Sequence, residues 1–503
     1  MAMELRDTGI DVVLLVGGDM HFDDAAQSLY AGPNVGIQGW ELDESRLRML
    51  GGSTNHWAGN CIPLDPIDFE ARPGIPYSGW PITRADLDPY YLRAQAYVET
   101  PSADLFDTPE RLAAIGPGAL DFDPDKLRTF IYAESTPTTF GYTYEEQLGA
   151  APSLRVLVHG SALEIETNDT ASEVTGVRAG TISGARFSVV ARHYVLAAGG
   201  VEIPRLLFLS NKVSPAGLGN GNDLVGRFFS DHYSIRPSLT SLGRDKAADL
   251  DLYTRSHDID GGYFRGAIGA SETLLREEEL PNFLFFVQAQ ENASPGRQSA
   301  QALRRAVGQG EMPSNLMWHL ENLLTDMDGV TNEIYRTVTG TNDNLIERTW
   351  IDPWVVTESI PDPESRIMLV DSRDPIFGQN QVAMDWRMAS GQLEVFVRAT
   401  EILAQELGRL GYGRIWSALL NDPESWPTYP AHGKHHCGTT RMSDDPRSGV
   451  VDADCRIHGV SNLFVASSAV FPTQGAATPT LTIVALSVRL ADHLKIRLAE
   501  GDL

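Results

Sequence analysis

The sequence predicts an α/β protein that contains a parallel sheet. Residues 2–6 have helical character, and a turn at residues 7–9 leads into Ile10–Val16, a short and mostly β-branched apolar run. Such a run is typical of a strand buried on both faces of a parallel sheet. A helix that feeds such a strand is one half of a βαβ unit, so the first residues already favour this fold class.

The same pairing of strand and helix recurs twice further along the chain. The stretch "YVLAAGG" (194–200) is an apolar strand that ends in glycines, and "VEIPRLLFLSN" after it predicts a helix. Near the C-terminus, "GVSNLFVASSAVFPT" predicts a buried strand and a turn. The final helix is expected to start at Pro479, because proline is well tolerated in the first helical turn.

The segments between these units predict further elements in order. Thr83 or Asp86 is a suitable cap for a helix after a proline-rich loop. Residues 154–196 alternate strand-like runs with turn signals, which indicates a β-meander. The region 236–430 is mixed, with a polar stretch near 291–314 that we expect to be mobile. Within it, apolar residues recur at helical spacing from Phe396 to Leu410 and stop at Gly411.

Composition narrows the classes of partner and compartment. The 503 residues leave room for two or more domains. Forty Lys and Arg against 67 Asp and Glu give a net charge of −27, which disfavours nucleic acid and anionic membrane surfaces. No apolar run is long enough for a membrane span. Three widely spaced cysteines fit a reducing compartment, so we expect a cytoplasmic protein, although a targeting segment ahead of Met1 would be hidden.

Four blocks, taken together, resemble the glucose-methanol-choline (GMC) family of flavin oxidoreductases. They are "RMLGGSTNHWAGN" (48–60), "YVLAAGGVEIPRLLFLSN" (194–211), "GNDLVGRFFSDH" (221–232) and the segment 435–494 that begins "HHCGTTRMSDDPRSG". The variant Ser-Thr-Asn-His-Trp in the first block is most similar to the sugar- and polyol-oxidising branch, which includes pyranose oxidases.

The resemblance implies a Rossmann-like FAD-binding domain, incomplete at its N-terminus, and a second α+β substrate domain. The FAD domain would comprise residues 1–62, 150–232 and 432–503, and the substrate domain residues 63–149 and 233–431. The implied activity is FAD-dependent oxidation of a CH–OH group on a small molecule, namely a sugar, polyol or glycoside. The electron acceptor is not identified by the sequence.

Two departures from the family concern the cofactor. Family members begin with a strand and a G-x-G-x-x-G loop that binds the FAD pyrophosphate. By comparison this sequence begins inside the following helix, so we expect that roughly fifteen residues are missing. The family also ends its second strand in an acidic residue that holds the adenosine ribose. Val16 occupies that place, and valine cannot accept a hydrogen bond.

The resemblance assigns the chemistry to His435 and Thr478. His435 matches the histidine that removes the hydroxyl proton in the family, and an idle retained histidine is the alternative. Thr478 lies in "GAATPT" where the family has Asn or His. Its shorter side chain is expected to donate one hydrogen bond to the substrate oxygen, but it cannot act as a base. A zinc site built from His432, His435, His436 and Cys437 is a weaker alternative, and we predict no metal.

The resemblance also places the flavin. The glycine turn would contact it through Gly51, Gly52, Ser53, Asn55 and His56. His56 matches the position that carries a covalent flavin bond in pyranose oxidases, and a non-covalent wall residue is the preferred interpretation. An ordinary turn is the alternative for the glycines, and simple packing is the alternative for Asn55 and Trp57.

Three positions complete the expected FAD contacts. Ala162 matches a strand position whose backbone meets the adenine, with a plain strand residue as the alternative. Ser467 would lie against the ribityl-diphosphate. The helix that begins at Pro479 would direct its positive N-terminal end at the flavin ring.

Three hypotheses about function follow. The first is an active FAD oxidoreductase whose start is placed too late. The second is a family member without FAD that is inactive or serves as a binding protein. The third is a lyase or hydrolase that uses His435 in the old pocket. A misplaced start does not explain why valine stands at position 16 or threonine at position 478. These two residues therefore keep the second and third hypotheses open.

Overall fold

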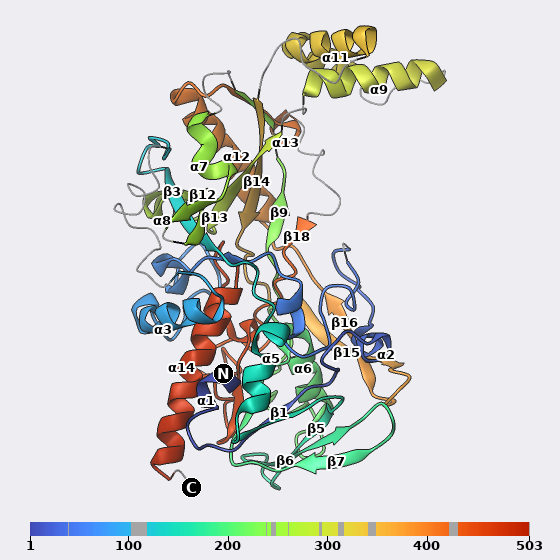
Figure 1. Ribbon diagram of the computed structural model, residues 1–503, viewed down its shortest axis with the longest axis vertical. Coiled ribbons are helices and arrows are strands. Elements are labelled where there is room, and N and C mark those ends of the chain that lie inside the picture. Colours follow the sequence, from blue (N-terminus) through green and yellow to red (C-terminus); the bar gives the residue numbers. More distant parts are fainter. Residues whose placement is uncertain are drawn as a thin grey trace.

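The computed structural model describes residues 1–38, 40–101, 118–237, 239–242, 248–259, 261–290, 294–309, 316–340, 349–421 and 431–501. The chain forms two halves (Figure 1). One half holds a large antiparallel sheet, and the other holds short parallel strand pairs, a small meander and the longest helix. Both termini lie in the second half.

Among the described residues, the large sheet has ten strands, and neighbours along it are antiparallel. Its main path is β17 (Arg414–Trp416), β10 (Leu239–Leu242), β14 (Thr349–Thr357), β13 (Phe283–Gln290), β12 (Gly262–Ala270), β3 (Leu127–Glu134) and β2 (Asn60–Cys61). The remaining strands extend it at three points: β11 (His257–Ile259) pairs with β12, β9 (Tyr233–Ile235) with β14, and β18 (Ala431–His432) with β9. Phe283 and Phe285 of β13 and Val355 of β14 are fully buried.

Two separate parallel pairs confirm the predicted α/β class. Strand β1 (Val12–Leu15) pairs with β4 (Leu154–Leu157), and β8 (Tyr194–Leu196) pairs with β19 (Leu463–Val465). Each of these pairs joins segments that are far apart in the sequence. The β-branched and apolar composition of all four strands suits this pairing.

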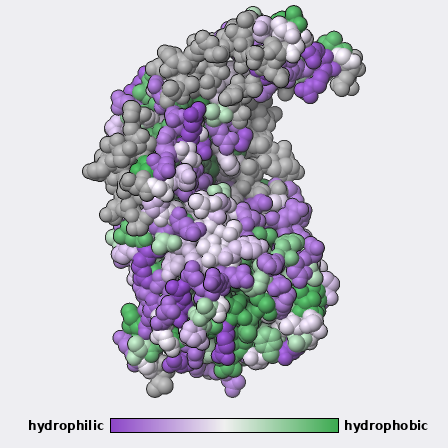
Figure 2. All heavy atoms as spheres, viewed as in Figure 1, coloured by the Kyte–Doolittle hydropathy of each residue, from purple (hydrophilic) through white to green (hydrophobic). Residues whose placement is uncertain are grey.

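The expectation that Ile10–Val16 is buried on both faces is wrong. Val13 is 37% exposed, and Leu157 on the partner strand is 39% exposed. The cause is topological, because in the described part of the chain β1 pairs with β4 alone. Figure 2 shows hydrophobic surface gathered in the region where Figure 1 places β1.

The predicted meander over 154–196 is smaller than expected. Three antiparallel strands form it, β5 (Ser161–Thr167), β6 (Val174–Gly180) and β7 (Arg186–Val189). The strands at either end of the predicted range, β4 and β8, instead join the two parallel pairs. A further hairpin is formed by β15 (Arg366–Arg373) and β16 (Asn380–Asp385).

The predicted helices are confirmed, with capping as expected. Helix α3 (Arg84–Tyr97) starts with a capping box in which Thr83 and Asp86 bond reciprocally. Helix α6 (Gly199–Leu209) follows β8, and α12 (Gln392–Arg409) buries Phe396 and Leu403 and ends before Gly411. The last helix, α14 (Thr480–Ala499), packs on α3 through a 2.8 Å hydrogen bond between Tyr91 and Thr482.

The remaining helices are mostly short connectors. They are α1 (Ala2–Leu5), α2 (Asp24–Gln27), α5 (Phe140–Ala150), α7 (Asp251–Thr254), α8 (Glu272–Glu277), α10 (Leu316–Thr325), α11 (Met327–Thr339) and α13 (Ala418–Asn421), with single 3-10 turns at η1 (Ser28–Tyr30), η2 (Gly52–Asn55), η3 (Pro66–Phe69), η4 (Ala248–Leu250) and η6 (Ser468–Val470). The polar stretch near 291–314 was expected to be mobile, but Pro295–Gln309 form helix α9. It packs against α10 and α11, a tertiary contact that composition does not reveal.

Two buried clusters supply most of the core. One is centred on the C-terminal segment and includes Phe464, Leu481 and Leu486; the other lies under the large sheet and includes Phe285 and Trp386. All three cysteines are buried free thiols. Within the described ranges, no helix has the length and apolar character needed to cross a membrane.

Candidate active site

The register between β9 and β18 brings two histidines together. Tyr233 of β9 lies opposite His432 of β18. His232, which precedes β9, and residues 433–435, which follow β18, are therefore neighbours. His232 Nδ1 lies 2.7 Å from His435 Nδ1, although 203 residues separate them in the sequence. His232 is buried and His435 is half-buried. Strands β9 and β18 lie where the two halves of the molecule meet (Figure 1).

Asp231 anchors the loop that carries His435. Its Oδ1 accepts a 2.8 Å hydrogen bond from the backbone N–H of His435. Burial raises the pKa of Asp231 to about 7, while backbone N–H groups of His435, His232, Lys434 and Gly433 oppose that shift. The loop is therefore tied to a buried carboxyl group through its main chain. This anchoring holds the His435 side chain against His232.

The segment 475–478 contacts the His232 ring at the nitrogen that does not face His435. His232 Nε2 lies 2.9 Å from the carbonyl oxygen of Gly475. Gly475 has φ +55, and a Cβ atom there would lie 2.3 Å from Asp68 Oδ2, so only glycine fits. Three residues later, the Thr478 hydroxyl lies 2.7 Å from the backbone oxygen of Asn60 and donates to it.

The bond to Asn60 limits what Thr478 can do. A hydroxyl has one proton to donate, and here that proton is directed at a carbonyl oxygen. Thr478 can therefore accept a hydrogen bond in this arrangement, but it cannot also donate one to a substrate oxygen. The proposed role as a substrate donor remains a prediction, and it requires the hydroxyl to rotate away from Asn60.

The glycine turn folds as a 3-10 turn whose side chains mainly stabilise the turn itself. Gly51 has φ +81, and a Cβ there would meet the backbone nitrogen of Gly141 at 2.3 Å. Asn55 Nδ2 donates to the backbone oxygens of Leu50 and Gly52. The requirement for glycine at position 51 thus has an explanation in main-chain packing, and the expected contact of Gly51 with the flavin stays a prediction.

His56 follows the turn and is exposed. The pKa of His56 is lowered by burial of part of its ring and by the positive charge of Lys434, which precedes His435. The charge of Lys434 therefore acts on the His56 ring. Ser53, also exposed, accepts a long hydrogen bond from Leu47 N.

The carboxyl ends of β8 and β19 carry the next group of predicted residues. Ser467 follows β19 and is 5% exposed, with its hydroxyl accepting from the N–H of Ala469. The neighbouring Ser468 donates to the His436 carbonyl, and Thr439 donates to Gly200 at the start of α6. The segment after His435 thus runs along the strand ends where parallel sheets bind ligands.

Pro479 and Ala162 occupy different surroundings. Pro479 precedes α14, whose N-terminal end lies at the junction of the two halves (Figure 1). The first N–H groups of a helix carry partial positive charge, so this end favours electron-rich atoms. Ala162 lies in β5 opposite Ala179, in the small meander.

Val16 follows β1 and leads into Gly17 and Gly18. Backbone atoms of Arg48 and Met49 pack so closely on Gly18 that a Cβ would lie 1.8 Å from the Arg48 oxygen. Asp19 comes next, with a side chain 40% exposed and Oδ2 3.4 Å from His159 Nε2. The carboxylate at this strand end is therefore three residues later than the position that Val16 occupies.

Two buried polar atoms among the described residues have the chemistry that a flavin ring would complement. Gln474, 1% exposed, has a buried Nε2 with no hydrogen-bond partner among the described residues, and the same holds for Asn55 Oδ1. A buried donor and a buried acceptor without partners are unfavourable unless a ligand supplies the complementary groups. The edge of a flavin ring offers both kinds of group. Val16, in contrast, does not fit the ribose hydroxyls.

A buried ionic network lies behind Gly475. Arg72 makes two hydrogen bonds to Glu358, of 2.9 and 2.6 Å, and Asn282 bonds to both Asp65 and Asp68. Burial raises the pKa of Asp68 to about 8, and the nearby Asp65 and Glu358 add to that shift. Since Gly475 packs on Asp68, the network supports the segment that contacts His232.

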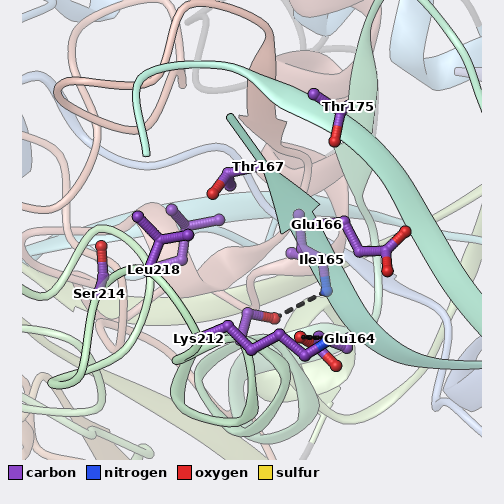
Figure 3. A pocket seen from close by; sticks show the side chains of 10 residues that line it. Glu164, Ile165, Glu166, Thr167, Thr175, Lys212, Ser214 and Leu218 are labelled. Atoms are coloured by element: carbon purple, nitrogen blue, oxygen red, sulfur yellow. Dashed lines mark hydrogen bonds and ion pairs between the residues drawn. The ribbon is translucent and has the colours of Figure 1, made fainter. Parts of the chain in front are cut away.

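A separate cavity of about 290 Å³ lies at the other end of α6 (Figure 3). Glu164–Thr167 of β5, Ser210 and residues 212–214 contribute to its lining. Glu164 is ion-paired with Arg178 and with Lys212, whose Nζ is 3.0 Å away. The candidate site contacts the N-terminal end of α6 at Gly200, so this cavity is distinct from it. Among the described residues, no cluster of three or more His, Cys, Asp or Glu could hold a metal ion.

The fold and the site define a two-part α/β protein with a histidine pair at the junction of its halves. Residues 361–487 match the family model described as GMC oxidoreductase. The C-terminal part of the chain is therefore similar to GMC oxidoreductases, and this similarity supports an enzyme that acts on CH–OH donors.

The chain is also similar to three curated relatives, and it shares its fold with a solved structure. The chain is 26% identical to the fructose dehydrogenase large subunit of Gluconobacter japonicus over 71% of its own length and 56% of that protein. It is 24% identical to 2-methyl-1,2-propanediol dehydrogenase of Mycolicibacterium austroafricanum (90% and 81% covered), and 25% identical to 6'''-hydroxyparomomycin C oxidase of Streptomyces lividus (91% and 80%). Pyridoxine 4-oxidase from Mesorbium loti shares the fold, with a TM-score of 0.55 at 18% identity, covering 98% of this chain and 96% of that one.

Sequence reasoning missed His232, Asp231 and Asn60 as parts of the site. All three lie inside or beside motifs that carry the family resemblance, yet the sequence assigned them no role. An Asp-His pair directly before a short strand was the available signal. Its meaning depends on the pairing of β9 with β18, which the sequence does not disclose.

Proposed function

We propose that this protein is an FAD-dependent oxidoreductase that oxidises a CH–OH group of a sugar, polyol or glycoside. The observation that carries the proposal is the contact of His435 with buried His232 on a loop anchored by Asp231. The names of the relatives support this substrate class: a fructose dehydrogenase large subunit, a 2-methyl-1,2-propanediol dehydrogenase and a 6'''-hydroxyparomomycin C oxidase. The buried free thiols fit a cytoplasmic location, and the electron acceptor is open.

In this proposal His435 removes the proton of the substrate hydroxyl. FAD, when bound, supplies the acceptor for the hydride that leaves the carbinol carbon. Gln474, Asn55 and the N-terminal end of α14 would hold the ring, the first two through their buried unpartnered atoms. Asp231 fixes the main chain of the His435 loop, so the base is held in place before substrate binds. A positioned general base of this kind contributes about 10²–10⁴ in rate.

The proposal is tested by loading the purified protein with FAD and mixing it anaerobically with a panel of sugars, polyols and glycosides. Loss of flavin absorbance with at least one of them is expected. Stable flavin absorbance with the entire panel would contradict the proposal. That result would favour a non-redox enzyme or a binding protein, the alternatives that Val16 and the Thr478–Asn60 bond support.

Replacing Thr478 by asparagine should raise the rate of flavin reduction by about ten- to a hundredfold. An asparagine amide has two N–H donors. One can keep the hydrogen bond to the Asn60 carbonyl oxygen, and the other can donate to the substrate oxygen. A hydrogen bond to a charged oxygen contributes about 1.5–3 kcal/mol, which corresponds to that range of rates.

Stopped-flow bleaching of the flavin measures this effect. Thr478→Val serves as the control, because it keeps the shape and removes both the donor and the acceptor. An asparagine variant that is no faster than the parent with any active substrate would show that Thr478 belongs to a fully adapted pocket.

A further inference from the structure

A second histidine is in direct contact with the residue that we propose as the base. The His232 and His435 rings are nearly perpendicular, with an interplanar angle of 88° and centroids 5.0 Å apart. Their Nδ1 atoms are 2.7 Å apart, and His232 Nε2 lies 2.9 Å from the Gly475 oxygen. Both ring nitrogens of His232 are therefore engaged, one with an imidazole and one with a carbonyl.

The carbonyl fixes which nitrogen of His232 carries the proton. A backbone oxygen can only accept a hydrogen bond, so the Nε2 of His232 must be the donor. A neutral imidazole has a single N–H, and the other nitrogen holds a lone pair. The Nδ1 of neutral His232 is then an acceptor.

His232 is neutral in the folded protein. It is 1% exposed, and burial lowers the pKa of its ring to about 4. The Gly475 carbonyl and the negative charge of Glu358 oppose this shift but do not outweigh the burial. Above that pH the only arrangement that makes a hydrogen bond across the 2.7 Å contact has His435 Nδ1 as the donor.

We propose that His232 is a positioning residue that holds His435 in the tautomer with its proton on Nδ1. The lone pair of His435 then lies on Nε2, which makes Nε2 the nitrogen able to take a proton. The assignment of the tautomer stands on the hydrogen-bond geometry, whereas its use in alcohol oxidation rests on the proposed function.

The consequence for proton removal follows from charge balance. The O–H bond of the alcohol breaks, an N–H bond forms at Nε2, and the bonding electron pair stays on the substrate oxygen. His435 becomes an imidazolium whose Nδ1–H still donates to His232. Because a hydrogen bond from a charged donor is stronger than one from a neutral donor, His232 stabilises the product of the proton transfer.

The tautomers can be observed directly by two-dimensional ¹H–¹⁵N NMR of protein with ¹⁵N-labelled histidine. The signals of His232 and His435 would be identified among the twelve histidines through single variants. We expect the Nδ1–H form for His435 and the Nε2–H form for His232 at neutral pH. An Nε2–H form for His435 would overturn the proposal.

Two variants separate a positioning role from a packing role. His232→Phe keeps an aromatic ring but has no acceptor, so His435 should become a mixture of tautomers. His232→Asn offers Oδ1 near the place of Nδ1, so the Nδ1–H form should persist. The same His435 tautomer in both variants would contradict the proposal. If the phenylalanine variant does not fold, the parent and asparagine spectra still decide it.

This experiment needs neither FAD nor substrate, so its outcome is independent of the proposed activity. A protein with the expected tautomers that reduces flavin with no alcohol would contradict the function and leave the positioning role intact. With active protein, His232→Asn should also recover most of the turnover that His232→Phe loses, while the apparent KM of both stays close to the parent value.

Discussion

Replacing His435 by alanine is expected to lower the rate of alcohol-dependent flavin reduction by about a hundredfold or more. A positioned base contributes about 10²–10⁴ in rate, and alanine offers nothing that can take the hydroxyl proton. The His435 ring is half-buried and its loop is held by Asp231 through the main chain. Because that bond does not involve the side chain, the loop should keep its conformation in the variant.

Stopped-flow kinetics with a substrate that reduces the parent provide the measurement. His257→Ala is the matched control, since His257 lies in β11 on the large sheet and contacts the Asp251 backbone. The control should keep the parent rate. Near-normal reduction by His435→Ala would remove His435 from the mechanism and leave the retained-but-idle histidine as the correct interpretation.

Replacing Glu358 by alanine should destabilise the protein by about 3–5 kcal/mol, the cost of leaving one partner of a buried ion pair uncompensated. The Glu358 side chain is fully buried and that of Arg72 is 7% exposed. Glu358 also accepts a hydrogen bond from the backbone of Asn282. The nearby Asp68 offers Arg72 some compensation, which places the expected loss toward the lower end.

Urea unfolding followed by circular dichroism measures the loss. The exposed pair of Glu272 and Arg276 is the control, and Glu272→Ala should change stability by less than about 1 kcal/mol. The double variant Arg72→Met with Glu358→Leu should regain most of the stability, because an apolar pair avoids the cost of burying charge. Equal losses in Glu358→Ala and Glu272→Ala would show that the buried network contributes little.

Local patterns predicted the helices well because their signals lie within one segment. The Thr83–Asp86 capping box and the apolar stripe that ends before Gly411 both appear in the structure. Burial of β1 was predicted wrongly, since exposure of Val13 depends on which strands lie beside it. Helix α9 was missed because its stability comes from packing on α10 and α11 rather than from its composition.

The candidate site shows the same limit. Motif resemblance located His435 and Thr478, but it could not reveal that His435 contacts His232 or that Thr478 donates to Asn60. Both contacts join residues more than 200 positions apart, through strand pairing and loop packing that no local pattern encodes. The expected contact of Gly51 with the flavin stays a prediction, and its close packing on Gly141 was visible only in the fold.

The central claim is that His435 serves the oxidation of a CH–OH group. Its most direct test is anaerobic stopped-flow reduction of the FAD-loaded protein by an active alcohol and by the same alcohol with deuterium on the carbinol carbon. We predict that deuterium slows the loss of flavin absorbance severalfold, because the C–H bond breaks in the step observed, and that His435→Ala slows both reactions. Flavin reduction whose rate changes neither with deuterium nor in His435→Ala would contradict the claim. So would a failure of every alcohol tried to reduce the flavin.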